Sequence, residues 1–176
     1  MNLKQNEKKP NLIFTVRMLV ASGLVIAAYI AVMYLTQSFS FGQYQMRIAT
    51  GLYALAAIHP FLVLPLGLAN LLSNALFGGL GFLDMIGGFA AGVLTSLGCL
   101  YLRKISVWLV GIPVLIIPTL LVPIWLSVLL TIPYMALVIS VGIGQIAPAI
   151  LAVFLVRYLE KPLKKLQDGT GFVPSR

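Results

Sequence analysis

Residues 106–130 read SVWLVGIPVLIIPTLLVPIWLSVLL and carry no charged side chain. An α-helix rises about 1.5 Å per residue, so a stretch of this length can cross the roughly 30 Å of hydrocarbon in a bilayer. The whole chain shares this bias, because 60% of its 176 residues are hydrophobic and 9% are charged, against roughly 25% charged residues in soluble domains. The sequence therefore predicts an integral membrane protein rather than a soluble enzyme.

Similar apolar runs, separated by Gly, Pro and charged residues, occupy most of the chain. They predict an all-α fold, a compact bundle of about six transmembrane helices forming one domain over 1–165. The run at 47–59 must be short, broken or continuous with its neighbour, because about a dozen α-helical residues cover only about 18 Å. A polar tail at 166–176 follows, and its GTGFVPSR ending resembles a cloning remnant. The predicted spans are 12–36, 47–59, 61–80, 83–102, 106–130 and 134–157.

Basic residues gather at the ends of these spans. Because cytoplasmic loops are enriched in Lys and Arg, the pattern predicts that both termini are cytoplasmic and that the number of spans is even. The net charge of +8 then reflects membrane topology rather than nucleic-acid binding. Segments 37–45 and 78–81 would face outward, and 58–60 inward. The residues are Lys4, Lys8, Lys9, Arg17, Arg103, Lys104, Arg157, Lys161, Lys164 and Lys165.

Catalytic and metal-binding motifs are missing from the sequence. Cys99 is the sole cysteine and lies in an apolar run, where it is expected to serve packing, and the sole histidine, His59, adjoins Pro60 as a loop residue. The sequence contains no phosphate-binding loop, no HExxH and no nucleophile elbow. We therefore expect neither an enzyme nor a resident cofactor or metal, and uptake of a solute would need separate ATP-hydrolysing partners.

Asp84 is the one acidic residue outside the polar tails. A carboxylate in a membrane span costs on the order of 2.5 to 3.5 kcal/mol, so it needs a cation, a polar ligand or water. Asn70 and Asn74 are four residues apart, share one helix face and lie just before Asp84 across a short turn. Together they predict an outer-leaflet pocket. The alternatives are a salt bridge from Asp84 to Arg47 and asparagines that merely join helices.

Other polar and aromatic residues are candidates for the same pocket. Gln145 lies in the middle of the last span, where its amide needs a partner. Tyr134, with Trp125, Tyr44 and Tyr53, lies toward the predicted outer side and could cover a flat ring, or belong to an interfacial aromatic belt.

Small residues recur every four positions in two spans, a spacing that lets another helix approach closely. In the fourth span they are Gly88, Gly92 and Ser96, in line with Asp84, and we expect them inside the bundle. In the first span they are Gly23, Ala27 and Ala31, and we expect these to bind a partner protein.

Three segments carry a resemblance to a known family: FGQYQMRIATGL at 41–52, LGLANLLSN at 66–74 and GGLGFLDMIGGFAAGVLTS at 78–96. They resemble the QueT family, membrane S components of energy-coupling factor (ECF) transporters associated with queuosine precursors. The resemblance implies a six-helix S component of the cell membrane that captures a 7-deazaguanine such as preQ1 or queuine outside. It would dock on a T subunit driven by two cytoplasmic ATPases, with the first-helix stripe as the T-subunit contact. The implied substrate-binding residues are Asp84, Asn70, Asn74, Arg47, Gln145, Gln45 and Tyr134.

The chain departs from the family pattern at Thr50 and Gln145, where acidic residues are expected. Two alternatives follow. The chain could be an S component for another vitamin or nucleobase-like micronutrient, or a small structural or sensory membrane protein in which Asp84 pairs with Arg47.

Overall fold

The computed structural model describes residues 12–40, 46–77 and 80–169, with side chains over 16–40, 46–77 and 80–162. All secondary structure in this part of the chain is helical. In order, the elements are α1 (Leu12–Leu35), α2 (Gln37–Ser40), η1 (Ile48–Ala57), η2 (Pro60–Leu62), α3 (Val63–Phe77), α4 (Phe82–Arg103), η3 (Val107–Val110), α5 (Gly111–Leu130) and α6 (Tyr134–Gly169). The elements η1 to η3 are 3-10 helices.

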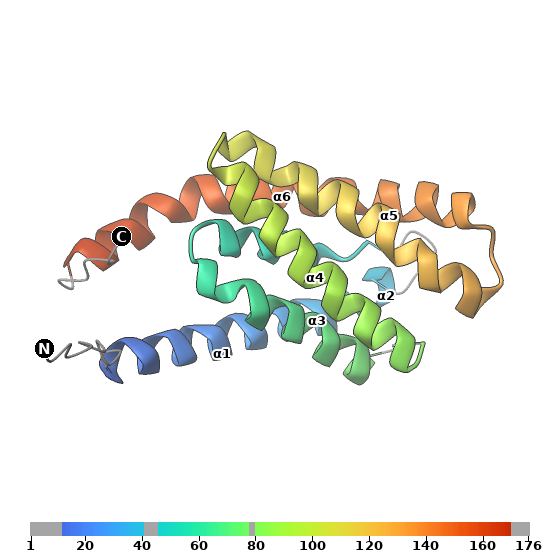
Figure 1. The fold of residues 1–176 in the computed structure, drawn as a ribbon, viewed down its shortest axis with the longest axis horizontal. Coiled ribbons are helices and arrows are strands. Elements are labelled where there is room, and N and C mark those ends of the chain that lie inside the picture. The colour runs from blue at the N-terminus through green and yellow to red at the C-terminus, as the bar shows by residue number, and fades with distance from the viewer. Residues whose placement is uncertain (1–11, 41–45, 78–79, 170–176) are drawn as a thin grey trace, which may run out of the picture.

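The chain runs back and forth along the long axis of the molecule, so that α1 begins and α6 ends at one end (Figure 1). We call this the terminal end, and the opposite end, where α4 begins and α5 ends, the distal end. Helix α5 packs on α6, α3 on α4 and α1 on α3, while η1 lies against α6 and α4.

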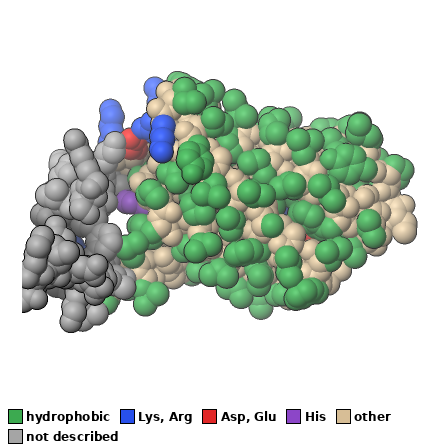
Figure 2. Space-filling model, viewed as in Figure 1, with side chains coloured by type: hydrophobic (Ala, Val, Ile, Leu, Met, Phe, Trp, Pro, Cys, Tyr) green, Lys and Arg blue, Asp and Glu red, His purple; other side chains and the backbone are tan. Residues whose placement is uncertain are grey.

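Five helices are long and apolar enough to cross a membrane: Val16–Leu35, Pro60–Phe77, Phe82–Arg103, Val107–Leu130 and Tyr134–Pro162. Large hydrophobic side chains cover the molecule between its ends, whereas Lys and Arg gather at the terminal end (Figure 2). Leu19, Leu35 and Val128 are more than 70% exposed, which suits contact with lipid rather than water. The protein is a multi-pass membrane protein.

The segment at 47–59, which the sequence predicts to be short, broken or continuous with its neighbour, is short in the structure. This segment forms η1, a 3-10 helix of 10 residues, which at about 2.0 Å per residue covers only about 20 Å. Six of its residues are buried, namely Ala49, Thr50, Gly51, Tyr53, Ala54 and Ala56. The run is therefore apolar because it lies inside the bundle, where it needs no membrane length.

Helix α6 extends well beyond the predicted end at 157, through the basic segment to Gly169. The prediction followed the apolar run, but a helix does not have to end where it leaves the hydrocarbon. The small-residue stripe of α4 lies inside the bundle as expected, since Gly88, Gly92 and Ser96 are buried. Gly81 starts α4 at φ 105°, a conformation that glycine adopts without strain.

Candidate functional site

Three residues on and before η1 form a single row. A 3-10 helix has three residues per turn, so Arg47, Thr50 and Tyr53 lie nearly above one another. All three are buried, with 5%, 3% and 1% exposure, and all three line one cavity. In an α-helix the first and last of them would be about 120° apart. The 3-10 conformation is thus what directs three side chains into one site.

The guanidinium of Arg47 reaches the neighbouring helix α3. Its Nη1 donates to Oδ1 of Asn74 at 3.0 Å and to Oδ1 of Asn70 at 3.4 Å. Both asparagines are buried, because residues four apart share the face of α3 that packs on the bundle. One cation therefore orients both amide oxygens.

The amide nitrogens of the same asparagines bond the backbone of α4. Asn70 Nδ2 donates to the carbonyl of Gly88 at 2.7 Å, and Asn74 Nδ2 donates to the carbonyl of Asp84 at 3.1 Å. A Cβ at Gly88 would lie 2.6 Å from Asn74 Nδ2, so this approach requires glycine. The three residues thus lie along the contact of α3 with α4, but of the three only Asn70 lines the cavity described below, and a shared ligand pocket stays a prediction.

The carboxylate of Asp84 is 2% exposed and accepts two N–H groups, one on each oxygen. The indole Nε1 of Trp125 donates to Oδ1 at 2.9 Å, and the backbone N of Leu80 donates to Oδ2 at 3.3 Å. Asn74 connects this residue to Arg47, since its amide bonds both. Arg47 and Asp84 are the two charged side chains that are buried among those whose burial is described.

Gln145 closes the opposite side of the site from α6. Its side chain is 1% exposed, and its Oε1 accepts the hydroxyl proton of Thr50 at 2.8 Å. Thr50 Oγ1 also lies 2.7 Å from the carbonyl oxygen of Arg47. The two positions at which the family pattern expects acids are therefore in direct contact.

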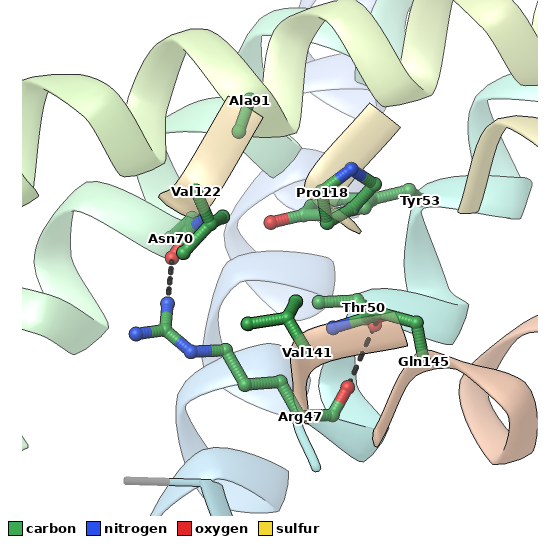
Figure 3. A pocket seen from close by; sticks show the side chains of 9 residues that line it. All are labelled: Arg47, Thr50, Tyr53, Asn70, Ala91, Pro118, Val122, Val141 and Gln145. Atoms are coloured by element: carbon green, nitrogen blue, oxygen red, sulfur yellow. Dashed lines mark hydrogen bonds between the residues drawn. The ribbon is translucent and has the colours of Figure 1, made fainter. Parts of the chain in front are cut away.

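A cavity lies between these groups, with Arg47 and Asn70 on one side and Thr50 and Gln145 on the other (Figure 3). Its volume is about 10 Å³, room for roughly one water, so a two-ring ligand fits only if the walls move apart. The remaining lining residues are Tyr53, Ala91, Pro118, Val122 and Val141. The lining combines a cation, two amides, a hydroxyl and an aromatic ring with apolar walls, a composition suited to binding a polar heterocycle.

Other predicted residues lie elsewhere. Tyr134 is 37% exposed at the start of α6, and its hydroxyl donates to the carbonyl of Leu120. Gln45 and Tyr44 are outside the described residues. Gly23, Ala27 and Ala31 are exposed on α1, and a Cβ at Gly23 would meet nothing within 4 Å.

Three features were missed by sequence reasoning. The first is the bond between Trp125 and Asp84, which depends on the register of α5 against α4. The second is the stacked pair of Tyr29 and Tyr53, whose buried hydroxyls lie 3.0 Å apart. The third is the contact of Thr50 with Gln145. Tyr29 had one available signal, a polar hydroxyl in the middle of an apolar span.

Metal-ligating side chains do not form a cluster in the described ranges: no three of the His, Cys, Asp and Glu residues there could hold an ion together. The thiol of Cys99 is buried and lies 3.5 Å from the carbonyl oxygen of Val110. It packs among apolar residues of η1, η3 and α6.

Comparison with known families identifies the chain. A family profile described as the QueT transporter matches residues 19–161, which include every described residue of the site. No curated protein and no solved structure matches the chain. The matched family is one of transporters, not of enzymes, and it implies a small-molecule substrate. The chain belongs to the QueT transporter family.

Proposed function

We propose that this chain is the substrate-binding S component of an ECF transporter and that it captures a 7-deazaguanine such as preQ1 or queuine. The observation that carries the proposal is the buried polar cavity between η1, α3 and α6. Burying a cation, a carboxylate and three amides inside an apolar bundle is costly. A polar solute that needs those same groups gives a reason for the cost.

The polar groups match the edges of such a base. A guanine-type edge offers two adjacent N–H donors, which suit a carboxylate, and we assign Asp84 to them. The amides of Asn70, Asn74 and Gln145 can meet its carbonyl and ring nitrogens. We assign Arg47, which lines the cavity, to a carbonyl oxygen of the base. Tyr53, which lines the cavity, supplies a ring on which a flat base can stack.

Charge sets the proposed orientation in the cell membrane. Arg103 and Lys104 lie at the end of α4, and Arg157 and Lys161 in the last part of α6. The positive-inside rule then puts the terminal end and both chain termini in the cytoplasm. The distal end, where Asp84 starts α4, would face outside and admit the substrate.

The partner surface is proposed for α1. Only 11% of the most apolar stretch of α1 is buried inside the protein, against 33–44% of the corresponding stretch in each of the other four spans. Tyr29 and Met33 hold α1 to the core, and at 100° per residue Gly23, Ala27 and Ala31 fall on the opposite side of the helix. A T subunit could approach this face closely, with the two ATPases bound beneath it.

One observation favours a second candidate, a neutral nucleobase-like micronutrient. Thr50 and Gln145 stand where the family pattern has acids, so the described part of the site provides one carboxylate, Asp84. A cationic aminomethyl group would find no second acid there. The choice between a cationic and a neutral base is an outcome of the experiment below.

Calorimetric titration of the purified protein tests the proposal. We expect the protein to bind preQ1, queuine or 7-deazaguanine itself, the neutral parent base. Asp84→Asn should lose about 2 to 5 kcal/mol of binding free energy, roughly 30-fold to several thousand-fold in affinity, because the amide N–H would face an N–H donor of the base. Thr50→Ala should cost about 1 kcal/mol or less. Thermal unfolding checks that both variants are folded. Wild-type affinity in a folded Asp84→Asn protein would show that Asp84 serves structure alone.

A further inference from the structure

The hydrogen bond between the Trp125 indole and the Asp84 carboxylate lies on the distal side of the cavity. Ala91 of α4 and Val122 of α5 line the cavity. Asp84 lies two turns before Ala91, and Trp125 one turn after Val122, both toward the distal end. The bond between them therefore joins α4 to α5 where a solute from that end would pass.

The Trp125 indole packs directly on the backbone of α4 because residue 87 is a glycine. An ideal Cβ built at Gly87 would lie 2.7 Å from Cδ2 and Cε2 of Trp125, much closer than carbon atoms pack. Only glycine at position 87 lets the ring rest on the helix backbone. The ring is also half-buried and packs against the cluster of Val122, Leu126 and Leu137.

The two donors on Asp84 have the chemistry of a guanine edge. One is the ring N–H of a fused two-ring heterocycle, the Trp125 indole, and the other is the backbone N–H of Leu80. Each binds a different carboxylate oxygen, as the paired N–H groups of a guanine-type base would. A carboxylate has about four lone-pair positions, so the competition is for the position on Oδ1 that the indole N–H already occupies.

We propose that Trp125 occupies the place of the substrate's N–H edge on Asp84, and that binding of the base displaces the indole and opens the cavity. This rests on the proposed function and names the group that the substrate replaces. It also accounts for the cavity's volume of about 10 Å³, because the ring that must leave is the one joining α4 to α5. Pro118 and Pro123 lie inside α5 and remove two of its backbone donors, so its distal half can bend.

Fluorine NMR of a protein with one tryptophan tests the displacement directly. The chain has two tryptophans, and Trp108 is 63% exposed beside Arg157, away from the site. We would introduce Trp108→Phe, label Trp125 with 5-fluorotryptophan, and titrate with preQ1 and the neutral parent base while measuring affinity by calorimetry. We expect a new fluorine resonance that grows in step with calorimetric saturation.

Two variants remove the indole N–H from Asp84 in different ways. Trp125→Phe keeps an aromatic ring but loses the N–H, and Gly87→Ala pushes the indole off α4. Both should bind the base about tenfold more tightly, because the competing donor on Asp84 is gone. Gly87→Ala should also move the fluorine resonance before any base is added. Ala90→Val adds bulk at an exposed position of the same helix and should change neither reading.

The outcomes separate the inference from the proposed function. Calorimetric binding with an unmoved resonance, or weaker binding in Trp125→Phe, would show that Trp125 holds Asp84 in position, so the displacement is wrong while the function stands. Binding of a base to Trp125→Phe but not to the protein with Trp125 would support displacement, because the indole would then block the base completely. No binding of either base to any variant would overturn both proposals.

Discussion

Helices α1 and η1, with the short helix α2 between them in the chain, are both apolar, yet they lie in opposite environments. Only 11% of the most apolar stretch of α1 is buried, whereas most residues of η1 lie inside the bundle. Helix α1 keeps the length of a membrane span and turns small residues outward. Helix η1 is shorter and turns Thr50 and Tyr53 into the cavity. Hydropathy predicts that both segments leave water, but helix period and neighbours decide whether a segment lies on the outside of the bundle or in its interior.

The strongest contrast is between two arginines. Arg47→Met should lower the free energy of unfolding by about 3 to 5 kcal/mol, because the buried amide oxygens of Asn70 and Asn74 both lose their donor. Arg17→Met, at an exposed position of α1, should change it by less than about 0.5 kcal/mol. Denaturation of the two proteins in the same detergent measures both. Equal losses would show that the buried position of Arg47 has no special energetic role.

A smaller contrast concerns two glycines. A Cβ at Gly51 would lie 3.1 Å from the carbonyl oxygen of Pro148 and from Leu151 Cδ2, whereas one at Gly23 meets nothing within 4 Å. Gly51→Leu should therefore cost about 1 to 3 kcal/mol by overpacking η1 against α6, and Gly23→Leu should leave stability unchanged. Thermal shift in detergent compares them. If Gly51→Leu melts with the parent protein, η1 does not pack on α6 as closely as described.

The long helices and the seam between α3 and α4 could be predicted from the sequence. Residues 70, 74 and 84 carry local signals, since a four-residue spacing and a short turn suffice to bring them together. The row of Arg47, Thr50 and Tyr53 could not be predicted, because ten apolar residues do not distinguish a period of 3 from one of 3.6. Contacts between residues far apart in the chain, such as Trp125 with Asp84, depend on packing register and leave no pattern in the sequence.

Tyr134 is the converse case, a residue that the sequence suggests for the site and that does not line the cavity. Its position after an apolar run suggested a ring for the ligand, but its hydroxyl bonds α5 and the side chain is partly exposed. Nothing in the sequence separates a tyrosine at the interface from one in a pocket. Whether it contacts a substrate stays a prediction.

The most direct measurement tests whether the outer face of α1 binds the T subunit while the polar site around Asp84 binds the ligand. Each protein would be co-expressed with the proposed T subunit and ATPases, then assayed by pull-down of the T subunit and by titration with the proposed 7-deazaguanine. Gly23→Leu and Ala27→Leu should lose the T subunit and keep the ligand, because bulk on the outer face of α1 blocks close approach. Asp84→Asn should keep the T subunit and lose the ligand, and Ala28→Leu, on a side face of α1, should keep both. Loss of ligand with retention of the T subunit in the Gly23 and Ala27 variants would contradict the account, because α1 would then belong to the pocket.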